Sequence, residues 1–244
     1  MLDTESSASM SSVEIAVVHR IDNEPVHESP FPHLSIDGIF PAEFYSEMLR
    51  QIPAREFYQR ITETGRASGD AYEQRLILHL TRLDALPIAQ RTFWKNLASW
   101  FVGSTLASAL AKKFAPVIAE NSGKDPRTLD YGVEAMLVKD LDGYQIGPHT
   151  DIRSRAVSVM FYLPPDDSYQ QYGTSLYVPR EPGFRSDGSA HLNFKDFDKV
   201  ETMPCRPNNM FGFARSDASF HGVEPIQSPG IERDVLLYIL RWRP

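Results

Sequence analysis

The second half of the chain consists of short strand-forming runs separated by turns, and this alternation limits the possible fold more than any other feature. Runs rich in β-branched and apolar residues occur at 131–138, 157–163, 174–178, 210–213 and 235–242. The segments between them contain proline, glycine, asparagine and aspartate, which favour turns. Many short strands with frequent turns predict an antiparallel β-barrel or sandwich.

The first half has a different pattern, which predicts helices. Pro41 suits the first turn of a helix, apolar residues then recur at helical spacing, and Pro53 ends the pattern. The region 87–118 has the strongest helical periodicity, with an apolar stripe that Gly103 interrupts. We expect this stripe to pack against a sheet.

A chain of 244 residues fits one large domain or two small ones, and no internal repeat or linker divides it. Residues 1–30 are expected to form a tail or a loosely attached arm, with a short strand at 13–18. Residues 31–244 are expected to form a single domain. Within it, 31–125 is predicted to be largely helical support and 126–244 the β-rich core.

Composition argues against several classes of protein. With 25 basic and 32 acidic residues the net charge is −7, whereas a non-specific nucleic-acid binder needs a basic surface. No apolar run approaches the length of a membrane span, and residues 1–12 lack the regions of a signal peptide. The single cysteine, Cys205, excludes an intramolecular disulfide and a zinc site built mainly on thiolates. We therefore expect a cytoplasmic protein with no membrane or nucleic-acid partner.

The segment Gly147-Pro148-His149-Thr150-Asp151 places an imidazole and a carboxylate two positions apart. In a strand, residues at this spacing point to the same face, so both side chains can reach one ion. His221, in another strand-like segment, is a candidate third ligand. Two histidines and one carboxylate form the facial triad that leaves positions open for substrate and O₂ on Fe(II).

These histidines also have structural interpretations. His149 lies next to a turn and could be a surface residue, and His221 precedes Gly222 and could be a capping or core residue. The remaining histidines have no comparable neighbourhood and are expected to be structural or exposed; they are His19, His27, His33, His79 and His191. Among these, only His191, on a polar loop, merits reconsideration.

Arg233 begins the last strand-like run, twelve residues after His221. Burying a guanidinium in a barrel is costly unless it meets a carboxylate. Its planar, two-pronged geometry suits the distal carboxylate of a dicarboxylic acid. The alternative is an arginine at the strand edge that pairs with Glu232 or stays solvated.

Taken in order, these residues resemble the Fe(II)- and 2-oxoglutarate-dependent oxygenases of the prolyl 4-hydroxylase-like branch. The resemblance covers 131–242 and rests on five blocks in the family's order, which are His149-Thr150-Asp151, the strand 157–163, Gly173-Thr174-Ser175-Leu176-Tyr177, His221-Gly222-Val223 and Arg233. It implies a fold that is mainly β with buttressing helices, a cupin-like jelly roll (double-stranded β-helix). One departure is Tyr172-Gly173, where many relatives carry Gly-Gly. Since related halogenases lack the carboxylate, Asp151 argues against halogenation.

By position, the resemblance makes His149, Asp151 and His221 the iron ligands at the catalytic centre. It makes Arg233 the partner of the C5 carboxylate of 2-oxoglutarate. Tyr162 and Ser158 are expected to assist at that carboxylate, although the Tyr162 ring could equally be a core residue. The implied reaction uses O₂ to hydroxylate a small-molecule or peptidyl substrate and releases succinate and CO₂.

Substrate contacts are less defined. Arg153 and Arg155 follow the metal pair and could bind an anionic substrate or be solvated charges. Tyr144 could line the pocket or be a turn aromatic, and the polar loop 180–202 could be a lid or a surface excursion. Two other functions stay open: a cupin-like metalloenzyme that does not use 2-oxoglutarate, and a non-catalytic jelly-roll binding protein. The sequence specifies neither the substrate nor the oligomeric state.

Overall fold

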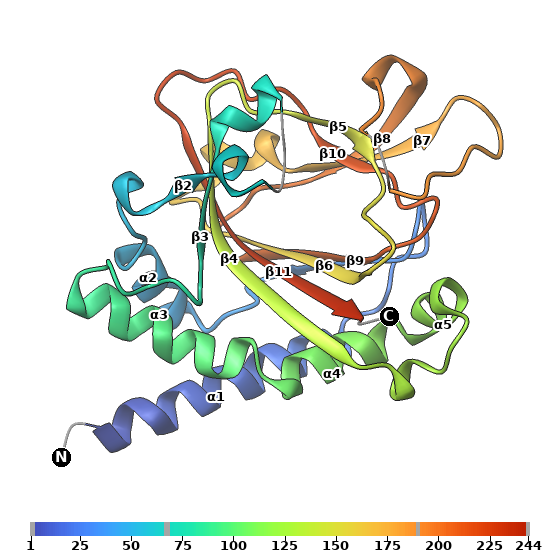
Figure 1. Cartoon of the computed structure of the whole chain (residues 1–244). Helices are drawn as coiled ribbons and strands as arrows, with labels where there is room; N and C mark the ends of the chain where they lie inside the picture. Colours follow the sequence, from blue (N-terminus) through green and yellow to red (C-terminus); the bar gives the residue numbers. More distant parts are fainter. Residues whose placement is uncertain (1–2, 66–68, 189–190, 243–244) are drawn as a thin grey trace.

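Two antiparallel β-sheets lie face to face and form the centre of the molecule (Figure 1). The computed structural model describes residues 3–65, 69–188 and 191–242. The large sheet has the strand order β1-β9-β6-β11-β4-β3-β2 and the small sheet the order β5-β10-β7-β8. In that order, the strands of the large sheet are His33–Asp37, Asn209–Ala214, Arg155–Tyr162, Glu232–Trp242, Tyr131–Leu141, Arg75–His79 and Gln59–Arg60. Those of the small sheet are Ile146–His149, His221–Val223, Thr174–Pro179 and Phe197–Met203.

The five strand-like runs of the sequence correspond to β4, β6, β7, β9 and β11, and the expected jelly roll is confirmed. Strand β11 is central to the large sheet, and its side chains alternate between two environments. Arg233, Val235 and Leu237 face the space between the sheets. Leu236 and Tyr238 face the opposite way, into the main hydrophobic core. This alternation gives one face of the sheet to a cavity and the other to the helices.

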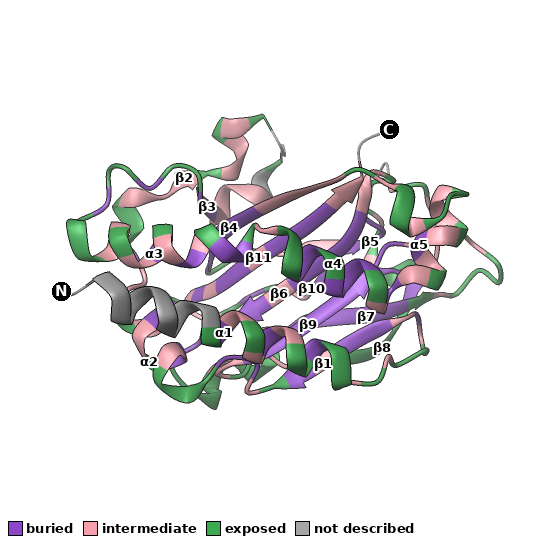
Figure 2. Ribbon diagram, turned by 90° about the horizontal axis from the view of Figure 1, so that it is seen from below, coloured by how far each residue is buried: buried purple, intermediate pink, exposed green. Residues whose placement is uncertain are grey.

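Helices cover the outer face of the large sheet (Figure 2). They are α1 (Asp3–Asn23), α2 (Ala42–Arg50), α3 (Ile88–Phe101), α4 (Ser104–Lys113) and α5 (Ala115–Ser122). No helix in the described part of the chain is both long enough and apolar enough to cross a bilayer.

The helical region expected at 87–118 is present but divided in two places. The first division is at Gly103, the residue before α4. A Cβ atom added to this glycine would lie only 2.9 Å from the carbonyl oxygen of Trp100, so the close approach of the chain here suits a residue without a side chain. A second division comes before α5, which has Pro116 in its first turn. Proline has no N–H and clashes with the preceding helical turn, so it begins a new helix rather than continuing α4.

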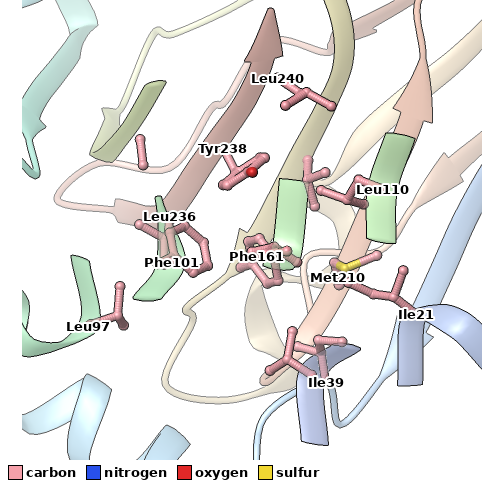
Figure 3. Close-up of a cluster of buried hydrophobic side chains, with 14 of the residues drawn as sticks. Ile21, Ile39, Leu97, Phe101, Leu110, Phe161, Met210, Leu236, Tyr238 and Leu240 are labelled. Atoms are coloured by element: carbon pink, nitrogen blue, oxygen red, sulfur yellow. The ribbon is translucent and has the colours of Figure 1, made fainter. Parts of the chain in front are cut away.

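Aliphatic and aromatic side chains fill the interface between the helices and the sheet (Figure 3). Phe101 of α3 packs edge-on against Phe161 of β6 and Tyr238 of β11, with ring centroids 5.2 and 5.3 Å apart. All three residues are fully buried. Burying each such ring contributes about 2 to 3 kcal/mol of transfer free energy, so this layer fixes the position of the helices on the sheet.

The N-terminal arm is a packed helix, and the short strand expected at 13–18 is wrong. Residues 13–18 lie within α1, and Val13, Val17 and Ile21 are buried in the main core. These three residues recur every four positions, so they share one face of a helix. Their β-branched side chains favour a strand locally, but burial against the other helices determines the outcome.

Further strands occur outside the five strand-like runs, and one of them, β1, lies in the segment 31–40, whose sequence indicates an extended entry to the fold. The loop expected at 180–202 ends in β8, an edge strand with only Phe197 and Met203 buried, so its alternation is weak; residues 189–190 of this loop lie outside the described part. Strands β1, β2 and β3 come from the half expected to be largely helical. Strand β3 has three consecutive buried residues, which leaves no alternating pattern to read.

Candidate metal centre

The three predicted metal ligands meet at the edge of the small sheet. His149 ends β5 and His221 begins β10, and these two residues are direct partners in the antiparallel register. Asp151 follows two residues after His149. All three are buried, and one ligand atom from each lies within 4.8 Å of the others. The ring centroids of the two histidines are 4.2 Å apart.

Hydrogen bonds to the backbone orient both imidazole rings. Nδ1 of His149 lies 3.0 Å from the carbonyl oxygen of Gly147, and Nδ1 of His221 lies 3.0 Å from that of Ser219. When Nδ1–H donates to the carbonyl, the lone pair of Nε2 is left for a metal ion. The two rings therefore have the orientation and the tautomer that a metal site needs.

The Asp151 carboxylate is held by two neighbouring side chains. Arg155 donates to one of its oxygens, and Ser158 Oγ donates to the other at 2.6 Å. Burial alone would raise the pKa of Asp151, but the charge of Arg155 and the hydrogen bond from Ser158 hold it well below its usual range. The carboxylate is thus ionised and fixed in orientation, and a carboxylate still has free lone pairs after accepting two hydrogen bonds.

The histidines are held in their neutral form. Burial lowers the pKa of His149 to about 3, and neighbouring His221 contributes to that shift. Burial also lowers the pKa of His221. Two neutral nitrogen donors and one carboxylate match the facial triad of non-haem Fe(II). The residues present therefore fit a divalent iron ion.

A cavity of about 710 Å³ opens between the two sheets and includes the three ligands in its lining. Alternate residues of β11 run along it, from Arg233 at one end to Arg241 at the other. Apolar side chains, among them Val235 and Ile239, line the wall between these arginines. The three candidate ligands thus lie in a cavity with apolar walls and with an arginine toward each end of one strand; Arg241 is paired with Glu134.

The Arg233 end of the cavity contains a buried cluster of charges. Arg233 is 1% exposed and donates from Nη1 to Oδ2 of Asp140, which is fully buried. Arg75 donates to both oxygens of the same carboxylate, at 2.6 and 2.8 Å. Both arginines also line the cavity.

Comparison with known proteins gives a clear result for the fold. No protein-family model and no curated protein matches the sequence. A solved prolyl hydroxylase from Trichoplax adhaerens, in complex with a hypoxia inducible factor peptide fragment, matches with a TM-score of 0.55 at 14% identity, over 98% of this chain and 93% of that one. A Pseudomonas putida prolyl-4-hydroxylase matches with a TM-score of 0.51 at 19% identity, over 95% of this chain and 100% of that one. The alpha ketoglutarate dependent carbocyclase SnoK from nogalamycin biosynthesis matches with a TM-score of 0.51 at 12% identity, over 92% and 82%.

This protein has the fold of the 2-oxoglutarate- and Fe(II)-dependent oxygenases. The expectation of a jelly roll resembling the prolyl hydroxylases is thereby confirmed at the level of fold. Within this oxygenase fold, His149, Asp151 and His221 come together as a group able to hold a metal ion.

The remaining residues that the resemblance implies for the site, Ser158 and Tyr162, lie in different surroundings. Ser158 contacts Asp151, as described above, and so supports a proposed metal ligand. Tyr162 donates to Thr174 Oγ1 at 2.8 Å, with its ring 5.5 Å from the Arg233 guanidinium. It is fully buried, whereas Thr174 lines the cavity. Tyr162 therefore lies behind Thr174 at the Arg233 end.

The three candidate substrate-binding residues also differ in their position relative to the cavity. Arg155 lines the cavity and pairs with Asp151, whereas Arg153 is exposed in the turn before β6. Tyr144 is fully buried, and its ring packs against the guanidinium of Arg75 at 4.2 Å. Of these three residues, Arg155 is the one that borders the metal centre.

Among the residues at or beside the cavity that the sequence did not single out are Tyr72, Arg75 and Asp140. Thr174, which also lines the cavity, lies within a block that carries the resemblance. His191, the one other histidine that merited reconsideration, packs edge-on against His149 at 4.5 Å and contacts the hydroxyl of Tyr72. Tyr72 and Arg75 come from the region before 131, outside the part of the sequence that carries the resemblance.

Proposed function

We propose that this protein is an Fe(II)- and 2-oxoglutarate-dependent dioxygenase that hydroxylates a small-molecule or peptidyl substrate. One observation carries the proposal. The buried triad His149, Asp151 and His221 shares its cavity with the buried guanidinium of Arg233. A metal site and a carboxylate-binding group in one cavity are what a 2-oxo dicarboxylate needs.

Each residue has a defined part in this proposal. The triad would hold Fe(II), and Arg155 and Ser158 would keep the carboxylate of Asp151 turned toward it. Arg233 would bind the distal carboxylate of 2-oxoglutarate. When bound, Fe(II) and 2-oxoglutarate supply the oxidation: O₂ is consumed, 2-oxoglutarate becomes succinate and CO₂, and one oxygen atom enters the substrate. The apolar wall of β11 would limit the access of water.

The nature of the substrate is part of the proposal. The solved prolyl hydroxylase from Trichoplax adhaerens was determined with a peptide, whereas SnoK is a carbocyclase of nogalamycin biosynthesis. Proteins with this fold therefore include one that binds a peptide and one that catalyses a cyclisation, so the fold by itself does not define the substrate. Action away from nucleic acids and membranes, in the cytoplasm, stays a prediction. The net charge of −7 is the observation that disfavours a nucleic-acid partner.

A metalloenzyme that does not use 2-oxoglutarate is the second candidate, and one observation favours it. Arg233 already has a carboxylate partner within the protein, Asp140. In this alternative the arginine would only stabilise the fold. The two functions differ in whether 2-oxoglutarate binds at all.

Anaerobic titration tests the proposal directly. Metal-free protein is loaded with Fe(II) and then with 2-oxoglutarate, while the visible spectrum and the melting temperature are followed. We expect the weak charge-transfer band of the metal–oxoacid chelate and a rise in melting temperature. His149→Ala should show neither. Folded, iron-loaded wild-type protein that gives no band and no stabilisation by 2-oxoglutarate would overturn the proposal.

A further inference from the structure

We infer that Arg75 is a specificity-determining residue, which supplies the positive charge that allows the Arg233 end of the cavity to accept a second carboxylate. The inference rests on the proposed function, because it concerns the same cavity. It adds a residue from outside the region of sequence resemblance.

The position of Arg75 follows from the strand register. Asp140 of β4 is the direct partner of Arg75 on β3 and of Arg233 on β11. The three residues therefore form one row across three adjacent strands. Direct cross-strand partners project from the same face of a sheet, which here faces the cavity.

The contacts within this row are close and largely shielded from water. Arg75 holds the carboxylate of Asp140 with two parallel hydrogen bonds, and Arg233 adds a third. The side chain of Asp140 is fully buried, while those of Arg75 and Arg233 are 17% and 2% exposed. The ring of Tyr144 packs on the guanidinium of Arg75 at 4.2 Å and limits its movement.

The charges of the row determine what it can bind. Arg233 and Asp140 alone form a neutral pair, which offers little attraction to an incoming anion. Arg75 changes the sum to two positive charges and one negative charge, a net charge of +1. Charges interact strongly where water is largely excluded, so this single charge has a large effect on the binding of a carboxylate.

Arg233 also has a free donor for that carboxylate. Its Nε atom is buried, and within the described part of the chain no group accepts a hydrogen bond from it. A buried N–H without a partner is unfavourable, so a ligand oxygen that accepts from it is stabilised. Arg75 supplies the charge, and Arg233 supplies the unused donor.

The experiment compares two ligands that differ only in the distal carboxylate, 2-oxoglutarate and 2-oxopentanoate. Their affinities for Fe(II)-loaded protein are measured anaerobically from the visible band and from the shift in melting temperature. We expect Arg75→Gln to weaken the binding of 2-oxoglutarate about 10- to 100-fold. Binding of 2-oxopentanoate should stay as in wild type. Arg60→Gln is the matched control, because Arg60 lies on the neighbouring strand β2 in an exposed pair with Glu73.

A double variant separates charge from a purely structural role. Arg75→Gln combined with Asp140→Asn leaves Arg233 as the one charge of the row, which restores the net charge of +1. We expect this variant to recover most of the lost affinity for 2-oxoglutarate. Circular dichroism and thermal unfolding identify variants that have not folded. Arg75→Lys then supplies a folded comparison that keeps the charge, and it should bind more tightly than Arg75→Gln.

Two results would overturn the inference: an unchanged affinity of Arg75→Gln for 2-oxoglutarate, or an equal loss of both ligands that Asp140→Asn does not reverse. These results differ from failure of the proposed function. If the proposed function failed, wild-type protein itself would bind Fe(II) and show no response to 2-oxoglutarate.

Discussion

His221 lies directly opposite His149 in the antiparallel pairing of β10 with β5, with the two ring centroids 4.2 Å apart. Because a strand pair holds both rings, the distance between them is set by backbone hydrogen bonds rather than by flexible loops. Both rings are oriented by carbonyl oxygens two residues earlier in the chain. The two imidazoles of the candidate metal centre are therefore held in place by the fold itself.

Removal of either imidazole should abolish tight metal binding. We expect His149→Ala and His221→Ala each to weaken the binding of Fe(II) at least about 100-fold. Even the loss of a residue that only hydrogen-bonds to a metal ligand lowers metal affinity about 10- to 100-fold. Anaerobic calorimetry measures the affinity. His19→Ala is the control, because His19 is exposed on α1. Tight binding of iron by both ligand variants would show that the ion lies elsewhere.

Ser158→Ala should weaken metal binding without unfolding the protein. Ser158 holds one oxygen of Asp151 at 2.6 Å, and its loss frees the carboxylate to turn. We expect Fe(II) to bind about 10-fold more weakly. Ser46→Ala, on the exposed surface of α2, should bind iron as wild type does. Equal affinities for the two variants would contradict a role for Ser158 in orienting the ligand.

The N-terminal helix should contribute to the stability of the whole fold. Ile21 is fully buried and Ile15, on the same helix, is 67% exposed. We expect Ile21→Ala to lower the free energy of unfolding by about 2 to 4 kcal/mol. For Ile15→Ala we expect a change within about 0.5 kcal/mol. Urea denaturation measures both values, and equal effects would mean that α1 is not docked in solution.

Stability should fall as the pH drops below the ordinary range of histidine. His33 is buried, and this burial lowers its pKa, although the Phe31 carbonyl partly opposes the shift. The unfolded chain therefore takes up the proton at a higher pH than the folded protein does. His33 therefore leaves the free energy of unfolding unchanged above about pH 6.5. Below that pH the free energy of unfolding falls progressively, by at most about 1.4 kcal/mol per pH unit for one such group.

Urea denaturation at several pH values between 7.5 and 5 measures this dependence. We expect His33→Asn to have a shallower loss of stability than wild type, because one proton-binding site of the unfolded chain is gone. His19→Asn, at an exposed position, should keep the wild-type slope. A steeper loss in His33→Asn would contradict the assignment.

Much of the candidate site follows from short stretches of sequence. His149 and Asp151 are two positions apart, and Arg233 begins a strand-forming run. Each of these patterns is weak by itself, and the order of the five blocks along the chain selected these residues. The apolar and β-branched runs likewise predicted five of the eleven described strands, four in the large sheet and β7 in the small one. The N-terminal helix was missed because its β-branched residues favour a strand, and only burial of one face decides for a helix.

What the sequence by itself determined is the set of donors: two imidazoles, one carboxylate and one arginine, in an order typical of a jelly roll. What only the tertiary structure decided is which charges surround them. Arg75, Asp140 and Arg233 are far apart along the chain, and they meet because three antiparallel strands pair in one register. The register is set by the packing of the whole sheet, so no local pattern shows that the predicted arginine already has a carboxylate partner and a second arginine beside it.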